Sequence, residues 1–187
     1  MAVAPVSEGL LLTIAQIAAT LIGLLLVGMF FYLESGFRRL TTLHVEAGAF
    51  LRAAVKLVLL LYALVLAVAL ALVAFDPLAV TALYALLSVA VVAALVAMTL
   101  RSRRLPGPVR RRHAAAWRVW PPTVVALAVP WVGGGWPLDA PALVDALFLV
   151  GALAFFLTGG VLLFAFDLAG IEHLAAAPGQ RRGPHQG

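Results

Sequence analysis

The chain has 187 residues, of which 64% are hydrophobic and only 11% are charged, with a formal net charge of +5. Soluble domains carry about 25% charged and about 45–50% apolar residues, so the composition excludes a soluble globule of this size. The absence of cysteine excludes disulfides, thiolate metal sites and cysteine nucleophiles. We therefore predict an all-α integral membrane protein, since helices satisfy their own backbone hydrogen bonds in lipid.

Five apolar segments are predicted to cross the bilayer, forming one polytopic transmembrane domain over residues 1–176. A helix needs about 20 apolar residues to cross a hydrocarbon core about 30 Å thick. Four segments reach this length, whereas the fourth in chain order is short and is interrupted by Pro130 and three glycines. The predicted spans are residues 9–33, 49–75, 78–100, 119–136 and 142–166. Residues 177–187 are predicted to be a disordered cytoplasmic tail.

The distribution of basic residues predicts the orientation in the membrane, because cytoplasmic loops are enriched in Lys and Arg. With five spans and the N-terminus outside, all 13 basic residues lie on the cytoplasmic side. If the fourth segment did not cross, Arg181 and Arg182 would lie outside. We therefore expect a multi-pass protein of the cell (inner) membrane with a cytoplasmic C-terminus. Arg52 and Lys56, at the start of the second span, have stems long enough to reach the interface.

The first span carries an ordered polar pattern. Thr13, Gln16, Thr20 and Gly23 are spaced 3, 4 and 3 apart and therefore form one stripe on a helix. Because a lipid-facing amide would lack hydrogen-bond partners, the stripe is expected to face protein or water. The leading interpretation of the stripe is a helix-packing seam, in which small residues allow close approach and Gln16 bonds across helices. The leading interpretation of the protein is one that packs with itself or with a membrane partner. The alternative is the lining of a path in a small oligomeric channel or transporter subunit.

One local resemblance lies in the same span. Residues 13–16 (Thr-Ile-Ala-Gln), followed by the run at 28–36 (Gly-Met-Phe-Phe-Tyr-Leu-Glu-Ser-Gly), resemble segments of small bacterial membrane proteins. The resemblance implies no activity.

Small residues and one acid mark the last span. Gly151, Gly159 and Gly160 are candidate packing positions, because small residues let transmembrane helices approach closely. Asp167 lies near the predicted cytoplasmic end of this span. We interpret it as an interfacial acid paired with an arginine.

The loop at residues 101–118 contains seven arginines. Anionic lipid headgroups attract such clusters, so Arg110, Arg111 and Arg112 are candidate lipid contacts. A short loop tethered to a membrane is a poor nucleic-acid binder, and no nucleic-acid partner is predicted.

No catalytic or cofactor-binding motif is found in the sequence. His44 and Glu46 are two residues apart, and Glu172 and His173 are adjacent, so neither pair shares a helical face well. No metal or cofactor is therefore predicted, and the leading interpretation is non-enzymatic. An intramembrane enzyme is a third interpretation, which would need Asp167, Glu172, His173 and His44 to meet around a metal.

Overall fold

The computed structural model describes residues 7–36, 42–102, 119–133 and 135–175, with side chains described for 7–28, 50–100, 119–132 and 135–163. Within these ranges the chain is all-helical, as the composition predicts. The helices are α1 (Glu8–Gly36), α2 (Thr42–Ala74), α3 (Pro77–Ser102), α6 (Trp120–Gly133) and α7 (Ala140–Ala175). Four of them are long and apolar enough to cross a membrane, and α6 is a shorter apolar helix.

The helices extend beyond the predicted spans at most of their ends. Helix α2 begins at Thr42, seven residues before the predicted start, and α7 continues nine residues past the predicted end to Ala175. Helical hydrogen bonding continues through polar residues that hydropathy counts as loop. Helix α6 is instead shorter than predicted and ends at Gly133, so Trp136 lies in the α6–α7 connection.

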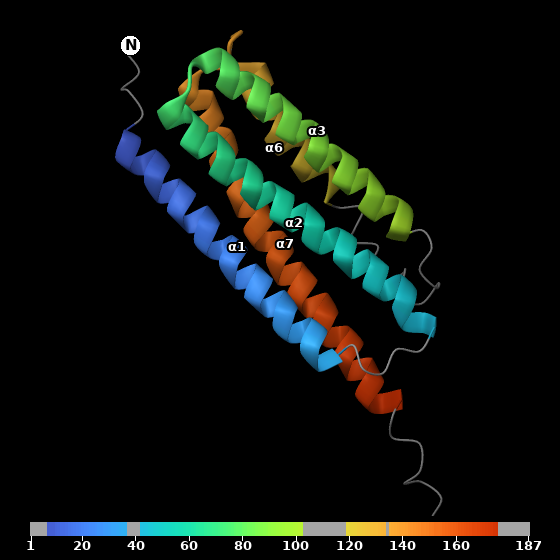
Figure 1. Cartoon of the computed structure of the whole chain (residues 1–187). Coiled ribbons are helices and arrows are strands. Elements are labelled where there is room, and N and C mark those ends of the chain that lie inside the picture. The colour runs from blue at the N-terminus through green and yellow to red at the C-terminus, as the bar shows by residue number, and fades with distance from the viewer. Residues whose placement is uncertain (1–6, 37–41, 103–118, 134, 176–187) are drawn as a thin grey trace, which may run out of the picture.

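Three helices begin at the same end of the bundle with polar or acidic residues (Figure 1). Before α1, the Ser7 hydroxyl accepts a hydrogen bond from the Leu10 amide at 3.3 Å, as an N-cap does. The carbonyls of Asp76 and Asp139 accept the first bonds of α3 and α7. Acidic residues at these positions complement the positive ends of the helix dipoles.

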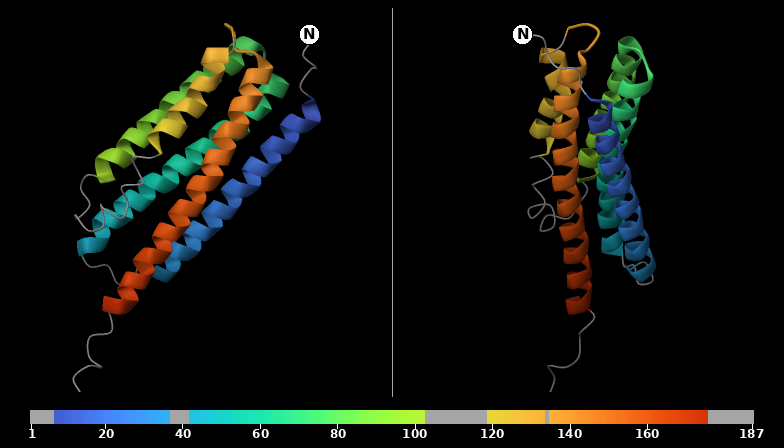
Figure 2. Two further views of the ribbon diagram at one scale, coloured as in Figure 1. Left: turned by 180° about the vertical axis from the view of Figure 1, so that it is seen from behind. Right: turned by 90° about the vertical axis from the view of Figure 1, so that its left-hand side faces the viewer.

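Helix α2 is the centre of the bundle, packing against α1, α3 and α7. Helices α1, α2 and α3 form one layer, and α6 and α7 form a second layer behind it (Figures 1 and 2). The core is therefore concentrated on α2, where Leu57, Leu61, Leu64 and Val68 are almost completely buried.

Polar side chains attach α6 and its connection to α3. The Trp120 indole N–H donates to the Thr99 hydroxyl at 2.8 Å, and the Tyr84 hydroxyl donates to the Leu127 carbonyl at 3.0 Å. Beyond α6, the Leu138 amide donates to the Thr81 hydroxyl at 3.1 Å. These bonds hold α6 in register with α3 along its length.

The bonds between α6 and α3 show how far α6 and the connection after it extend along α3. Thr81 and Thr99 are 18 residues apart on α3, which is about 27 Å at 1.5 Å per residue. The segment from Trp120 to Leu138 begins at the level of Thr99 and ends at the level of Thr81. Although α6 has only 14 residues, it and the following connection therefore extend along about 27 Å of α3.

The Thr81 bond makes a testable contribution to stability. Its hydroxyl donates to the Pro77 carbonyl and accepts from the buried Leu138 amide, so Thr81→Val removes both bonds without changing shape. We expect the free energy of unfolding to fall by about 1–3 kcal/mol, because a buried amide loses its acceptor. Reversible unfolding in mixed micelles measures this. Thr13→Val is the matched control, since the exposed Thr13 hydroxyl bonds the Gly9 carbonyl of its own helix and no other described residue. An equal loss of unfolding free energy in both variants would contradict the contribution assigned to Thr81.

Candidate functional site

The polar stripe of α1 lies on the outside of the bundle. Helix α1 packs on α2 through a narrow face that includes Leu11, Ile14, Ala15 and Ala18. Thr13, Gln16, Thr20 and Gly23 are all exposed on the rest of the helix surface. None of the other described helices therefore covers the stripe.

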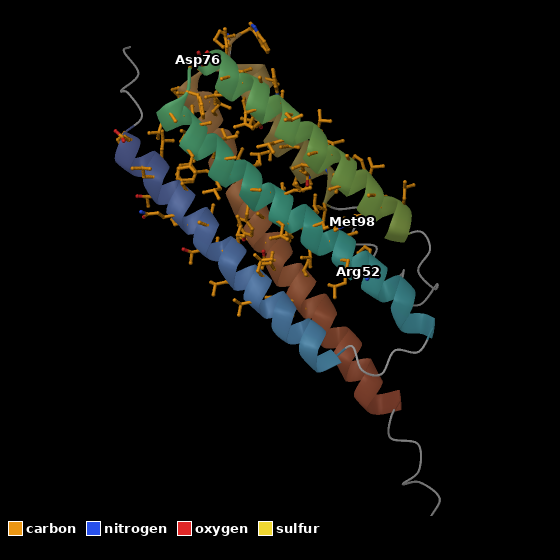
Figure 3. All side chains as sticks on the ribbon, viewed as in Figure 1. Arg52, Asp76 and Met98 are labelled. Carbon is orange, nitrogen blue, oxygen red and sulfur yellow. The ribbon has the colours of Figure 1, made fainter. Side chains whose placement is uncertain are left out.

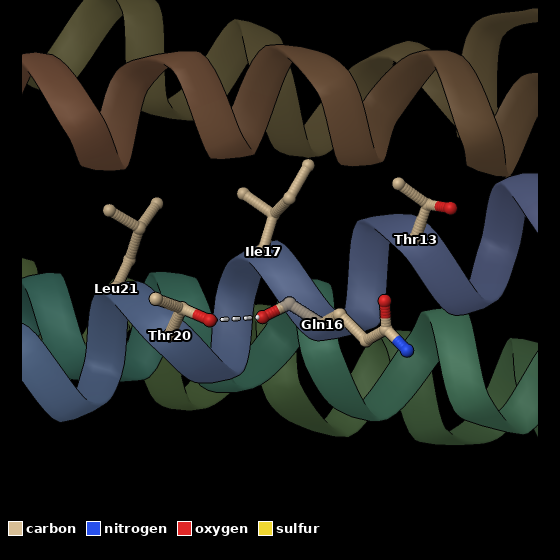
Figure 4. Close-up of a pocket in the computed structure, with 5 residues that line it drawn as sticks. All are labelled: Thr13, Gln16, Ile17, Thr20 and Leu21. Carbon is tan, nitrogen blue, oxygen red and sulfur yellow. Dashed lines mark hydrogen bonds between the residues drawn. The ribbon is translucent and has the colours of Figure 1, made fainter.

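The hydroxyls of Thr13 and Thr20 are hydrogen-bonded within α1, whereas the Gln16 side-chain amide has no such bond. The Thr13 hydroxyl donates to the Gly9 carbonyl at 2.8 Å, and the Thr20 hydroxyl donates to the Gln16 carbonyl at 2.9 Å (Figure 4). No hydrogen bond joins the Gln16 side-chain amide to any described residue. This amide offers two donors and an acceptor, so it is the unsatisfied polar group of the stripe.

Gln16 lies far enough along α1 that an unsatisfied side-chain amide there is unfavourable in a bilayer. Gln16 lies eight residues after Glu8, which is about 12 Å along the helix axis. An amide without partners in an apolar environment costs about 1–3 kcal/mol by mutational data. Glu8 stands at the polar end of the helix, so at this depth Gln16 lies well inside the apolar part of α1.

A shallow groove of about 240 Å³ lies beside the stripe, lined by Thr13, Gln16, Ile17, Thr20 and Leu21. Ile17 and Leu21 project from α1 towards α7, whereas the Gln16 amide lies along the outer surface of α1 (Figure 4). Helix α1 makes few contacts with α7. The groove is open and mostly apolar, and it contains no charged group.

Among the described residues, nothing packs closely on the Cα atoms of the candidate packing glycines of α7. A Cβ atom built on Gly151, Gly159 or Gly160 would meet nothing within 4 Å. A polar contact between α7 and α2 is made by Thr158, whose hydroxyl lies 3.2 Å from the Tyr62 hydroxyl. Tyr62 was not expected from the sequence, since a lone tyrosine in an apolar span carries no signal of its partner.

Charges are segregated between the two ends of the bundle. The described acidic side chains are Glu8, Asp76, Asp139 and Asp145, all near the end where α1, α3 and α7 begin. Arg52 and Lys56 lie towards the opposite end, on α2. Asp145, exposed on the second turn of α7, was not singled out from the sequence because it is isolated in a long apolar run.

Several candidate residues lie outside the described side chains. Asp167 belongs to the helical backbone of α7, but its side chain is not among those described, and Arg110, Arg111 and Arg112 lie wholly outside. The side chains of His44, Glu46, Glu172 and His173 are likewise outside. Among the described residues, no group of three His, Cys, Asp or Glu side chains is arranged to hold a metal ion.

Comparison with known proteins gives no relative: no family model, no curated protein and no solved structure matches this chain.

The open glycine face gives a prediction for the isolated chain. Gly159→Ala and Gly160→Ala should leave the free energy of unfolding unchanged or raise it by up to about 1 kcal/mol, because alanine favours helix and meets no neighbour. Ala154→Leu, at a fully buried position of the same helix, should lower it by about 1–3 kcal/mol. Unfolding measured in detergent that disperses the protein to single chains compares the three variants. A loss at Gly159 as large as that at Ala154 would contradict the open face.

Proposed function

We propose that the protein is a five-span protein of the cell (inner) membrane, with the N-terminus outside and the C-terminus in the cytoplasm. The crossing of α6 is supported by its register with α3, since Trp120 and Leu138 are bonded to residues about 27 Å apart in depth. This distance is close to the thickness of the hydrocarbon core.

The proposed orientation is supported by charge. The described acidic side chains lie at the end proposed to face outside, and Arg52 and Lys56 lie towards the other end. The remaining basic residues are Arg101, in the last turn of α3, and those that follow α1, α3 or α7 in the sequence; these three helices end on the same side. Basic residues concentrated on one side specify the cytoplasmic side.

Single cysteines test the orientation, because the chain has no native cysteine. We expect an impermeant maleimide to label Ser7→Cys in intact cells, and Ser102→Cys only after the cells are opened. Gly187→Cys should behave like Ser102→Cys if α6 crosses. Labelling of the tail from outside would reduce the count to four spans, and a reversed pattern at Ser7 and Ser102 would contradict the orientation.

For the function, we propose that the protein is non-enzymatic and associates with itself through α1. The observation that carries the proposal is the exposed Gln16 amide, which has no hydrogen-bond partner among the described residues. A second Gln16 is a suitable partner, since each amide offers both a donor and an acceptor. Two copies in one membrane share one orientation, so their α1 helices would run parallel around a two-fold axis.

The surface around Gln16 has the spacing of a helix-pairing seam. Exposed residues recur at intervals of four and three along α1, and we call this set the Gln16 seam: Gly9, Thr13, Gln16, Thr20, Gly23 and Val27. Gly9, Gln16 and Gly23 are seven residues apart, as are Thr13, Thr20 and Val27. This heptad spacing is typical of left-handed helix pairs, and small residues allow the close approach that membrane helices need. Gln16 then occupies the place of the polar residue that fixes register in such pairs.

Gln16→Leu tests the association. We expect it to weaken self-association by about 1–2 kcal/mol, or about five- to thirtyfold, because interhelical hydrogen bonds in membranes have this strength in peptide studies. Energy transfer between labelled copies, measured over a dilution series in liposomes, gives the dissociation constant. Thr20→Val is the matched control and should change it little, since the Thr20 hydroxyl bonds its own helix.

Two outcomes would contradict the proposed association. One is an unchanged dissociation constant for Gln16→Leu. The other is a wet seam: an ion or solute flux that Gln16→Leu alters, with cysteines at Thr13, Gln16 and Thr20 reactive to aqueous reagents in liposomes. That result would favour the channel or transporter interpretation, with the path between copies.

A further inference from the structure

We propose that Arg52 and Lys56 form a binding site for the phosphate of an anionic lipid in the cytoplasmic leaflet. Both side chains are exposed, and they lie one helical turn apart on α2. Residues at this spacing have Cβ atoms about 5–6 Å apart on one helix face. The site is independent of self-association through α1.

The two cations have no counter-charge from the described part of the protein. The described acidic residues, Glu8, Asp76, Asp139 and Asp145, lie near the other end of the bundle, and Figure 3 shows Arg52 far from Asp76. No ion pair joins Arg52 or Lys56 to a described residue. Two like charges side by side at a lipid-facing position are unfavourable unless an anion lies between them.

Their depth matches a lipid phosphate. Lys56 is 18 residues before Ala74, the last residue of α2, which is about 27 Å along the axis. With Ala74 at the outer boundary, Lys56 therefore lies at the inner boundary of a core about 30 Å thick. Arg52 lies one turn further, at headgroup level. Helical side chains lean towards the helix N-terminus, so the Lys56 stem extends towards Arg52.

The surface of α2 also offers a place for the acyl chain. Helix α2 packs on α1, α3 and α7, and its exposed and partly exposed residues form a strip that recurs at intervals of three and four along the helix. Beyond the two cations this strip continues through partly exposed Leu59, Ala63 and Leu66 to exposed Leu70. The acyl chain of a lipid whose headgroup binds Arg52 and Lys56 can therefore lie along these apolar side chains. The two non-bridging oxygens of one phosphodiester supply one acceptor for each cation.

Titration of the full-length protein in neutral detergent with phosphatidylglycerol, followed by native mass spectrometry, tests the site. If the two cations hold one phosphate together, Arg52→Gln and Lys56→Gln should each lower affinity to within about twofold of the double variant. Independent attraction would give about fivefold for each and about 25-fold for both, and that multiplicative result would overturn the shared site. Unchanged affinity in the double variant would also overturn it.

Three further arms identify the ligand and control for folding. Replacing Arg110, Arg111 and Arg112 by Gln should leave the Arg52-dependent binding intact; loss of all binding would move the site to the loop. Phosphatidylcholine should bind less, and inorganic phosphate should not displace phosphatidylglycerol. Displacement would mean that the ligand is a soluble anion rather than a lipid.

Lys56→Glu, which supplies a carboxylate one turn from Arg52, should keep the helical content of the parent and lose phosphatidylglycerol binding. A folded Lys56→Glu variant that still binds would overturn the site.

Discussion

Hydrocarbon supplies no hydrogen-bond donors or acceptors, and the interior of this bundle follows from that constraint. The hydroxyls of Thr81, Thr99 and Thr123 each donate to the carbonyl four residues earlier. The Tyr84 hydroxyl donates to the Leu127 carbonyl of α6. Of the buried side-chain polar atoms described, Ser88 Oγ alone has no partner. Apart from Ser88, the described part of the interior therefore satisfies its polar side chains from within, and most of the core consists of aliphatic side chains.

We infer that two groups of polar side chains on the outer surface are binding sites. Gln16 carries an amide without a partner, and Arg52 and Lys56 carry charges without counter-ions among the described residues. The chemistry differs between the two places. A neutral amide is satisfied by another amide, which favours a second copy of the chain, whereas paired cations favour a phosphate. Both places lie on faces that the other described helices leave open, on α1 and α2.

The sequence was sufficient to predict the long helices but not the contacts between distant segments. Hydropathy located the four long helices, because a run of apolar residues long enough to cross lipid needs no tertiary information. It could not show that the Leu138 amide bonds to Thr81, or that Tyr62 meets Thr158, since both bonds depend on how distant segments pack. Spacing placed Thr13, Gln16 and Thr20 on one face, but periodicity does not reveal whether a neighbouring helix covers that face. The same limit applies to Gly159 and Gly160, which small size alone marked as packing positions and which the single chain leaves uncovered.

We propose that the Gln16 amide is satisfied by the same amide of a second copy. Solid-state nuclear magnetic resonance on a lipid sample mixing ¹⁵N-labelled and ¹³C-labelled protein measures this directly, because a ¹⁵N–¹³C contact can arise only between copies. We expect transfer between Gln16 Nε2 of one copy and Gln16 Cδ of the other, lost when either copy carries Gln16→Leu. A Gln16 amide that shows no such transfer and contacts only water or lipid methylene protons would contradict it.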